Sequence, residues 1–193
     1  MLFYREGGDI VQALSTDKKY TYDEYEKLDD DNRYELLDGV IFLMTPPLRI
    51  HQEIGGELYR SLGNFLAGKP CKVYIAPFLV RLDNNTALEP DLAVVCDKSK
   101  LDAKGCFGAP DMVIEILSPS TASYDKVLKF NKYLEAGVRE YWIVDPSDKI
   151  VSVHILRDGE YIVRSYGETD SIPVFILDGF EISMKEVYAS LWE

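Results

Sequence analysis

The chain has 193 residues, 47% of them hydrophobic, and its 33 acidic and 21 basic residues give a formal net charge of −12 at pH 7. This length can bury a full hydrophobic core and predicts one domain over residues 1–193, with 1–20 as a loosely ordered N-terminal segment. No apolar run reaches about 18 residues and the N-terminus lacks a signal-peptide core, so we expect a cytoplasmic protein without a membrane span. The acidic charge works against extended wrapping of nucleic acid, because Lys and Arg supply that affinity.

Three cysteines, Cys71, Cys96 and Cys106, are an odd number without a Cys-x-x-Cys pair. This pattern argues against a disulfide framework and a zinc knuckle, and predicts free, reduced thiols. Only His51 and His154 are available as histidine ligands. We therefore expect any bound metal to have oxygen ligands and to be a hard cation such as Mg²⁺ or Mn²⁺.

The first predicted element is a short helix over residues 21–28, where Thr21 and Glu24 have the spacing of a capping box. An Asp-Gly pair flanked by apolar residues predicts a hairpin over 34–44. Apolar residues at spacings of three and four predict an amphipathic helix over 48–66. Strands are then expected at 72–75, 78–82, 91–95 and 112–117.

A second helix is predicted to begin at Ser118–Thr121 and to end at Gly137. A strand over 140–145 follows, and then a hairpin over 150–166 that turns at Asp158-Gly159. The order strand, helix, strand between 111 and 145 indicates a right-handed βαβ unit with parallel strands.

Two carboxylates stand in apolar strand segments, Asp91 before Leu-Ala-Val-Val and Glu115 within Val-Ile-Glu-Ile-Leu. Burying an unpaired charge is costly, so a metal ion, a cationic side chain or a bound proton must compensate it. The pattern alone leaves two interpretations equally open, a structural carboxylate satisfied by a base or by backbone amides, and a functional site.

The second helix carries Asp125, Lys129 and Tyr133 at spacings of four, on one polar stripe. Charged helix faces are mostly solvated, so the spacing favours an exposed ion pair between Asp125 and Lys129. The alternative is that Lys129 reaches Glu115, one crossover away, and stabilises a hydroxide or a charged transition state.

Pro90-Asp91, then Glu115 in a hydrophobic strand, then a helix with lysines, resembles the PD-(D/E)XK nuclease superfamily. The segments 111–121 and 136–146, the stripe of the second helix, the Tyr34–Gly39 pattern and His51-Gln52 are similar to the Uma-type family of putative restriction endonucleases, formerly a domain of unknown function. The resemblance covers about Thr21 to Asp145 and is expected to extend to the end of the chain.

This resemblance implies a mixed α+β fold with a restriction-endonuclease-like core. A central mixed sheet would be flanked by helices, with an N-terminal helix and hairpin and a C-terminal hairpin added. It also implies a Mg²⁺- or Mn²⁺-dependent endonuclease that hydrolyses DNA phosphodiester bonds and acts as a homodimer.

By the same resemblance, Asp91 and Glu115 would bind the metal ion together with the backbone carbonyl of Ile116, and Glu35 would be a further acidic residue of the site. His51 would contact a phosphate, although a lone helical histidine is more often structural.

The superfamily pattern has a lysine two residues after the acidic residue, where this chain has Leu117. The cation is therefore expected from the following helix, at Lys129, with Lys126 as the fallback.

Two other functions remain open at this point. The displaced lysine and the acidic charge are compatible with a catalytically weak or inactive nuclease-fold module that binds nucleic acid or protein. Two carboxylates also permit metal-independent acid/base hydrolysis of the glycosidase type, which metal dependence would distinguish from a nuclease.

Overall fold

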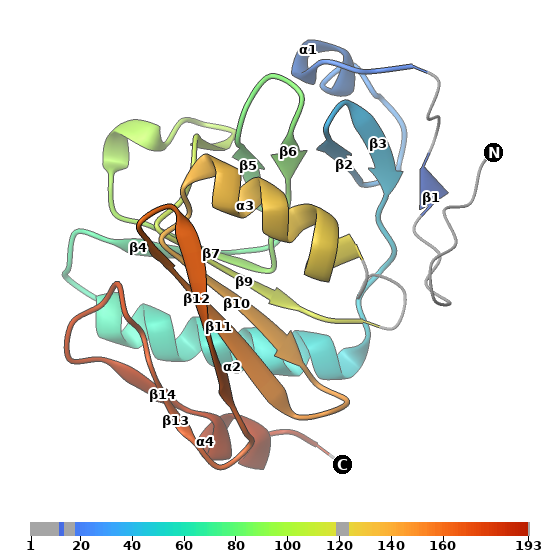
Figure 1. Cartoon of the computed structure of the whole chain (residues 1–193). Coiled ribbons are helices and arrows are strands. Elements are labelled where there is room, and N and C mark those ends of the chain that lie inside the picture. Colours follow the sequence, from blue (N-terminus) through green and yellow to red (C-terminus); the bar gives the residue numbers. More distant parts are fainter. Residues whose placement is uncertain (1–11, 14–17, 119–123, 193) are drawn as a thin grey trace.

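The computed structural model describes residues 12–13, 18–118 and 124–192 and has a mixed α+β architecture (Figure 1). Its helices are α1 (Tyr22–Tyr25), α2 (Arg49–Leu66), α3 (Phe130–Ala136) and α4 (Met184–Ala189), with a 3₁₀ turn (Lys98–Lys100) and a π-helical turn η2 (Tyr124–Lys129). Its strands are β1 (Gln12–Ala13), β2 (Tyr34–Leu37), β3 (Val40–Leu43), β4 (Lys72–Ile75), β5 (Leu79–Arg81), β6 (Ala87–Leu88), β7 (Leu92–Val95), β8 (Gly105–Phe107), β9 (Met112–Ile116), β10 (Glu140–Asp145), β11 (Ile150–Arg157), β12 (Glu160–Tyr166), β13 (Ser171–Pro173) and β14 (Glu181–Ser183).

The strands form two six-stranded mixed sheets and a two-stranded sheet of β13 and β14. The N-terminal sheet has the order β1-β3-β2-β6-β5-β8, and the C-terminal sheet has the order β12-β11-β10-β9-β7-β4. The prediction of one central sheet is therefore wrong. Strand β6 pairs with β2 on one side and β5 on the other, which joins the N-terminal hairpin to β5 and β8 in a second sheet. Strands as short as β6 and β8 give no periodicity that the sequence could reveal.

Most of the longer predicted elements are confirmed. The amphipathic helix, both hairpins and the strands at 72–75 and 140–145 are present, and β9 and β10 are parallel, as expected for a βαβ unit. Both Asp-Gly turns have positive φ at each residue, 51° and 77° at Asp38-Gly39 and 50° and 86° at Asp158-Gly159, which suits tight hairpins. The predicted capping box of Thr21 and Glu24 is also formed.

The C-terminal sheet is covered on both faces, with α3 above it and α2 below it in Figure 1. Side chains alternate along its strands, so Ile114 and Ile116 of β9 pack with α2, while Val113 packs in the cluster of α3. The N-terminal sheet contributes to this second side, where Leu37 joins the α3 cluster. Polar side chains on that side are consequently enclosed between the two sheets and α3.

The second helix differs from its prediction. Residues Tyr124–Lys129 form a π-helical turn before α3, which ends at Gly137 with φ 84°. A π turn is wider than an α turn, so residues four apart within Tyr124–Lys129 do not lie on one stripe as they would in an α-helix. The predicted start at 119–121 lies outside the described residues, as do the side chains of Asp125 and Lys126.

The predicted loosely ordered segment is only partly described. Residues 1–11 and 14–17 lie outside the described part of the chain, whereas Gln12–Ala13 pairs with β3 as strand β1. Within the ranges that the structure describes, no helix combines the length and the hydropathy needed to cross a membrane.

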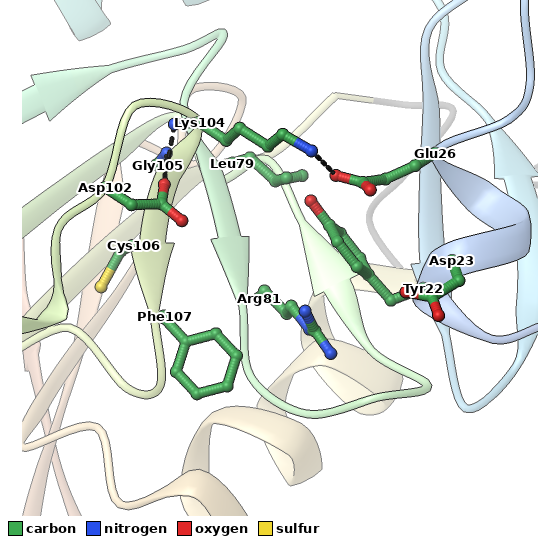
Figure 2. A pocket seen from close by; sticks show the side chains of 10 residues that line it. All are labelled: Tyr22, Asp23, Glu26, Leu79, Arg81, Asp102, Lys104, Gly105, Cys106 and Phe107. Atoms are coloured by element: carbon green, nitrogen blue, oxygen red, sulfur yellow. Dashed lines mark hydrogen bonds and ion pairs between the residues drawn. The ribbon is translucent and has the colours of Figure 1, made fainter.

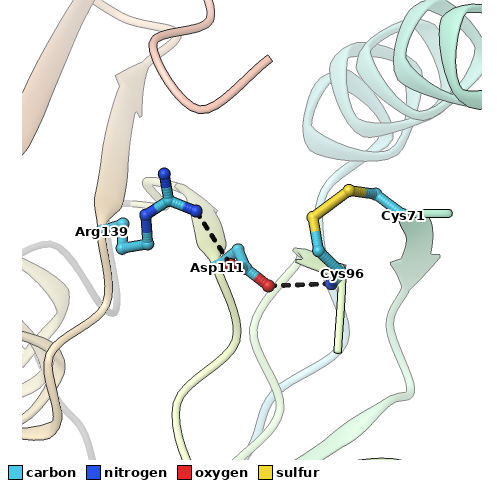
Figure 3. Close-up of a disulfide and its surroundings, with 4 residues drawn as sticks. All are labelled: Cys71, Cys96, Asp111 and Arg139. Atoms are coloured by element: carbon cyan, nitrogen blue, oxygen red, sulfur yellow. Dashed lines mark hydrogen bonds and ion pairs between the residues drawn. A yellow bond between two sulfur atoms is a disulfide. The ribbon is translucent and has the colours of Figure 1, made fainter. Parts of the chain in front are cut away.

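The prediction of three free thiols is wrong, because Cys71 and Cys96 form a disulfide (Figure 3). Antiparallel pairing of Lys72 with Val95 brings the cysteines opposite each other at the neighbouring position, with their Cα atoms 3.9 Å apart. Asp111 accepts a hydrogen bond of 2.8 Å from the Cys96 amide. Only the strand pairing, not the sequence, identifies which two of the three cysteines meet; Cys106 stays free and buried.

Candidate active site

Two buried glutamates from different sheets face each other in the interior between the sheets and α3. Glu35 lies on β2 and is 0% exposed, and Glu115 lies on β9 and is 3% exposed. Because side chains alternate along a strand, Glu35 points to the same side as Leu37, and Glu115 to the same side as Val113. The two-residue period therefore delivers both carboxylates to one place.

Lys129 connects these carboxylates. Its Nζ lies 3.0 Å from Glu35 Oε1 and 3.1 Å from Glu115 Oε1, and the residue is 2% exposed. Burying an ammonium group requires such partners, because it loses its hydration on leaving water. The spacing favoured an exposed Lys129, whereas the residue is buried against the two glutamates. The side chain of Asp125, its predicted partner, lies outside the described residues.

Tyr133 completes the surroundings of Glu115. Tyr133 follows Lys129 by four residues, and its hydroxyl donates a hydrogen bond of 2.9 Å to Glu115 Oε1. Complete burial raises the pKa of Tyr133 well above its ordinary value, and the nearby Glu115 carboxylate adds to this shift. The hydroxyl therefore stays protonated and remains a donor. The sequence placed Tyr133 on the stripe of Lys129 but did not assign it to the site.

Asp91 occupies a second part of the site, just before β7. Its Oδ2 accepts a hydrogen bond of 2.7 Å from the backbone amide of Ile116 and lies 3.0 Å from His51 Nε2. His51 comes from the first turn of α2, where Arg49 begins the helix. For His51 the family resemblance implies a phosphate contact and its lone helical position favours a structural role; here its Nε2 contacts the carboxylate of Asp91.

The two parts line one open pocket of about 90 Å³, to which Asp91, Glu115, Lys129 and His51 all contribute. This volume is enough for about three water molecules or a partly hydrated ion. The buried Glu35 does not line the pocket. At the rim, Arg33 forms an ion pair with Glu89, which follows β6.

The site carries more negative than positive charge when its carboxylates are ionised. Glu35, Glu115 and Asp91 contribute three negative charges against the one positive charge of Lys129. Glu35 Oε1 accepts from the Glu89 amide at 2.8 Å, while its buried Oε2 has no hydrogen-bond partner among the described residues. A bound cation or a proton would balance this excess.

Hard oxygen donors are the ligands available for such a cation. Within residues 12–13, 18–118 and 124–192, no three His, Cys, Asp or Glu side chains converge as a group that could hold a metal ion. Mg²⁺ needs fewer protein ligands, since it commonly binds one or two carboxylates and keeps several waters. Asp91 and Glu115 at the pocket wall fit that requirement.

The structure thus brings together Glu35, Glu115 and Lys129, with Asp91 in the same pocket. The fallback Lys126 cannot be placed, because its side chain lies outside the described part. Glu140 is a further buried carboxylate, but it is satisfied structurally by Trp142 Nε1 at 2.7 Å and the Ile176 amide at 2.9 Å. The local apolar pattern alone does not separate Glu140 from Glu115, since both stand in apolar strands.

A second pocket, of about 200 Å³, lies against β5 and β8 and involves none of these residues (Figure 2). Both basic side chains of its lining have partners within the pocket. Lys104 contacts Glu26, and the Arg81 guanidinium lies 4.1 Å from the centre of the Tyr22 ring. The pocket lined by Asp91, Glu115 and Lys129 is therefore the stronger candidate for an active site.

Known proteins are similar to this chain over most of its length. A family model described as "Uma2: Putative restriction endonuclease" matches residues 22–185. The uncharacterized protein slr1290 of Synechocystis sp. is 25% identical over 178 residues, which are 90% of this chain and 93% of that protein.

Among solved structures, a "putative nuclease belonging to DUF820" from Anabaena variabilis is similar, with a TM-score of 0.74. It is 20% identical, and the match covers 88% of this chain and 97% of that one, so it supports the fold alone. The family model, in contrast, spans the strands, α2 and α3 that build the pocket. The chain therefore belongs to the Uma2 family of putative restriction endonucleases.

Proposed function

We propose that this protein is a Mg²⁺- or Mn²⁺-dependent endonuclease that hydrolyses DNA phosphodiester bonds at the pocket of Asp91, Glu115 and Lys129. The observation that carries the proposal is a buried lysine held between two glutamates at the wall of a pocket that also contains Asp91. Buried charges of this kind, beside an open polar pocket, are typical of catalytic sites. Membership of the Uma2 family supports the reaction class.

In this proposal, Asp91 and Glu115 hold the cation, with the Ile116 carbonyl as a further ligand. When bound, the cation polarises the phosphate and lowers the pKa of the attacking water. Lys129 fixes Glu115 through Oε1 and supplies positive charge against the charge that develops in the transition state. The Tyr133 hydroxyl donates a hydrogen bond to the same oxygen of Glu115. With two partners on one oxygen, the Glu115 carboxylate has little freedom to rotate.

Glu35 has a positioning role. It binds the shared Lys129 and is anchored by the Glu89 amide, so it sets where the ammonium group lies. His51 lies at the pocket beside Asp91, where it orients that carboxylate. Catalysis therefore rests on positioning and electrostatics supplied by residues of β2, β9, α2, η2 and α3 and by Asp91 just before β7.

The test is nicking of supercoiled plasmid DNA with Mg²⁺, with Mn²⁺ and with EDTA. We expect cation-dependent nicking that falls by at least about a hundredfold in Asp91→Asn and in Glu115→Gln, as for loss of an electrostatic catalytic group. Glu135→Gln is the matched control, because Glu135 is an exposed glutamate that pairs with Lys132 away from the pocket. Equal activity of Asp91→Asn, Glu115→Gln and wild type would refute the assignment.

Calorimetry with Mg²⁺ gives a readout that does not depend on turnover. Wild type and Glu135→Gln should bind the cation, and Glu115→Gln should not. Folding of each variant is checked by circular dichroism. DNA binding without nicking in the wild type would identify a binding module instead of an enzyme, and cation-independent hydrolysis would favour acid/base chemistry of the two carboxylates.

A further inference from the structure

Strand β12 (Glu160–Tyr166) is an outer strand of the C-terminal sheet (Figure 1), and β11 is its only strand neighbour in the described part of the chain. It is seven residues long, and its side chains at Ile162 and Val163 are 53% and 52% exposed. An exposed, apolar outer strand of this length is a template for pairing with another strand. It raises the question of which strand could pair there.

Among the described residues, β12 has unpaired backbone groups at alternate positions. The Leu156 amide of β11 donates to Arg139 in the segment before β10, so the neighbouring Ile155 directs its backbone groups to β12. Ile155 pairs with Ile162, and therefore Ile162 bonds inward. Tyr161 and Val163 consequently direct their N–H and C=O groups outward, where they can bond to a further strand.

The charged side chains of β12 would match those of a second, antiparallel copy of the same strand. Glu160, Ile162 and Arg164 lie on one face of the strand, with opposite charges at equal distances from Ile162. In an antiparallel pair of two β12 strands centred on Ile162, each Glu160 would lie opposite the partner's Arg164. Neither residue forms an ion pair within the described part of the chain; the Arg164 guanidinium lies 5.0 Å from the centre of the Phe175 ring.

This arrangement fits the hydrogen-bonding pattern as well. In the same register, Tyr161 lies opposite the partner's Val163, and both have outward backbone groups. Ile162 meets the partner's Ile162 at a non-hydrogen-bonded position, where side chains are closest. Charges on an outer strand usually prevent association, but here symmetry converts them into two attractive pairs.

We propose that two copies of this chain associate through β12, in an antiparallel, two-fold symmetric pair centred on Ile162. The two C-terminal sheets then form one continuous sheet of twice as many strands. The other outer strand of this sheet, β4, is shorter and has a lysine with no acidic residue, so it is not self-complementary. The proposal concerns the assembly of the protein and does not depend on nuclease activity.

A charge-reversal cycle tests the register. Sedimentation equilibrium should show a dimer for the wild type, and Glu160→Arg and Arg164→Glu should each raise the dimer Kd by at least about tenfold, because two attractive pairs become two repulsive ones. The double variant restores both pairs and should return the Kd to within about threefold of wild type. These side chains are exposed, so the variants should retain the wild-type circular dichroism spectrum.

A cross-link tests the symmetry axis. In this register the two Ile162 Cα atoms lie about 4.5 Å apart, so Ile162→Cys should form an intermolecular disulfide under mild oxidation. Val127→Cys is the matched control, since Val127 is 56% exposed and lies on η2.

Preferential cross-linking of Ile162→Cys over Val127→Cys supports the pair. A monomeric wild type, single reversals without effect, a double variant without recovery, or equal cross-linking of the two cysteine variants would overturn it.

Discussion

Replacing Lys129 by Met tests the central contact of the site. Methionine keeps much of the length and the apolar character of the side chain, but it removes the ammonium group that lies 3.0 Å from Glu35 and 3.1 Å from Glu115. Both carboxylates are buried, at 0% and 3% exposure, so water cannot replace the lost partner without a rearrangement. We expect a large loss of stability.

The magnitude follows from this geometry. At about 3 Å and an effective dielectric constant of about 20, each contact gives about 5 kcal/mol of gross attraction. Desolvation of the three groups offsets most of this attraction, but removing one partner leaves the cost of the remaining buried charges, about 3–5 kcal/mol. For a chain of this length, that loss lowers the Tm by about 6–20 °C.

The assay is urea unfolding followed by tryptophan fluorescence at pH 7, with thermal melts in parallel. Lys132→Met is the control, because Lys132 follows one turn later and pairs with the half-exposed Asp38 and the exposed Glu135. Loss of these partly solvated pairs should cost less than about 1 kcal/mol. A double variant, Lys129→Met with Glu35→Gln, should recover at least about 1 kcal/mol relative to additivity, since it removes one uncompensated charge.

A loss below about 1 kcal/mol for Lys129→Met, equal to that of Lys132→Met, would refute the reasoning. So would strict additivity in the double variant, because contacting residues are expected to couple.

Three further predictions concern single features of the fold. Tyr133→Phe removes the hydroxyl donor to Glu115 and should cost about 1.5–3 kcal/mol in urea unfolding, with no change meaning that this hydrogen bond is not formed. Burial lowers the pKa of His154 from 6.5, so as the pH falls below 6.5 the unfolded chain binds a proton before the folded protein does, and the free energy of unfolding declines. This decline should be shallower in His154→Gln. The same dependence of unfolding free energy on pH in wild type and variant would contradict the prediction. Titration of the denatured, unreduced protein should detect one thiol, and reduction of the disulfide between Cys71 and Cys96 should reveal all three. Reduction should also destabilise the fold by about 3 kcal/mol. Three thiols before reduction would show that the disulfide is absent.

Local signals account for much of the fold. The Asp-Gly turns, the three- and four-residue spacing of α2 and the apolar strands predicted elements whose geometry depends on near neighbours. The N-terminal sheet was not predicted, because β6 and β8 are short and their pairing joins segments far apart in the chain. The π turn before α3 likewise has no sequence periodicity of its own.

The sequence indicated which residues the candidate site contains, but not how they contact one another. Family resemblance selected Glu35, Asp91, Glu115 and Lys129, but spacing alone favoured a solvated Lys129. Only the enclosure between the sheets and α3 makes this lysine a buried partner of two glutamates. The same enclosure gives Tyr133 its role as a donor.

The sequence by itself determined which side chains share a face, because the periods of strands and helices are local properties of the backbone. It also determined the family, through residues that recur as a pattern. The tertiary structure decided which carboxylate is structural and which lines a pocket. Glu140 and Glu115 occupy similar apolar strands, yet one meets Trp142 and a backbone amide and the other meets Lys129. The tertiary structure also decided which cysteines pair. The partners of the glutamates and of the cysteines are brought together only when distant segments of the chain pack.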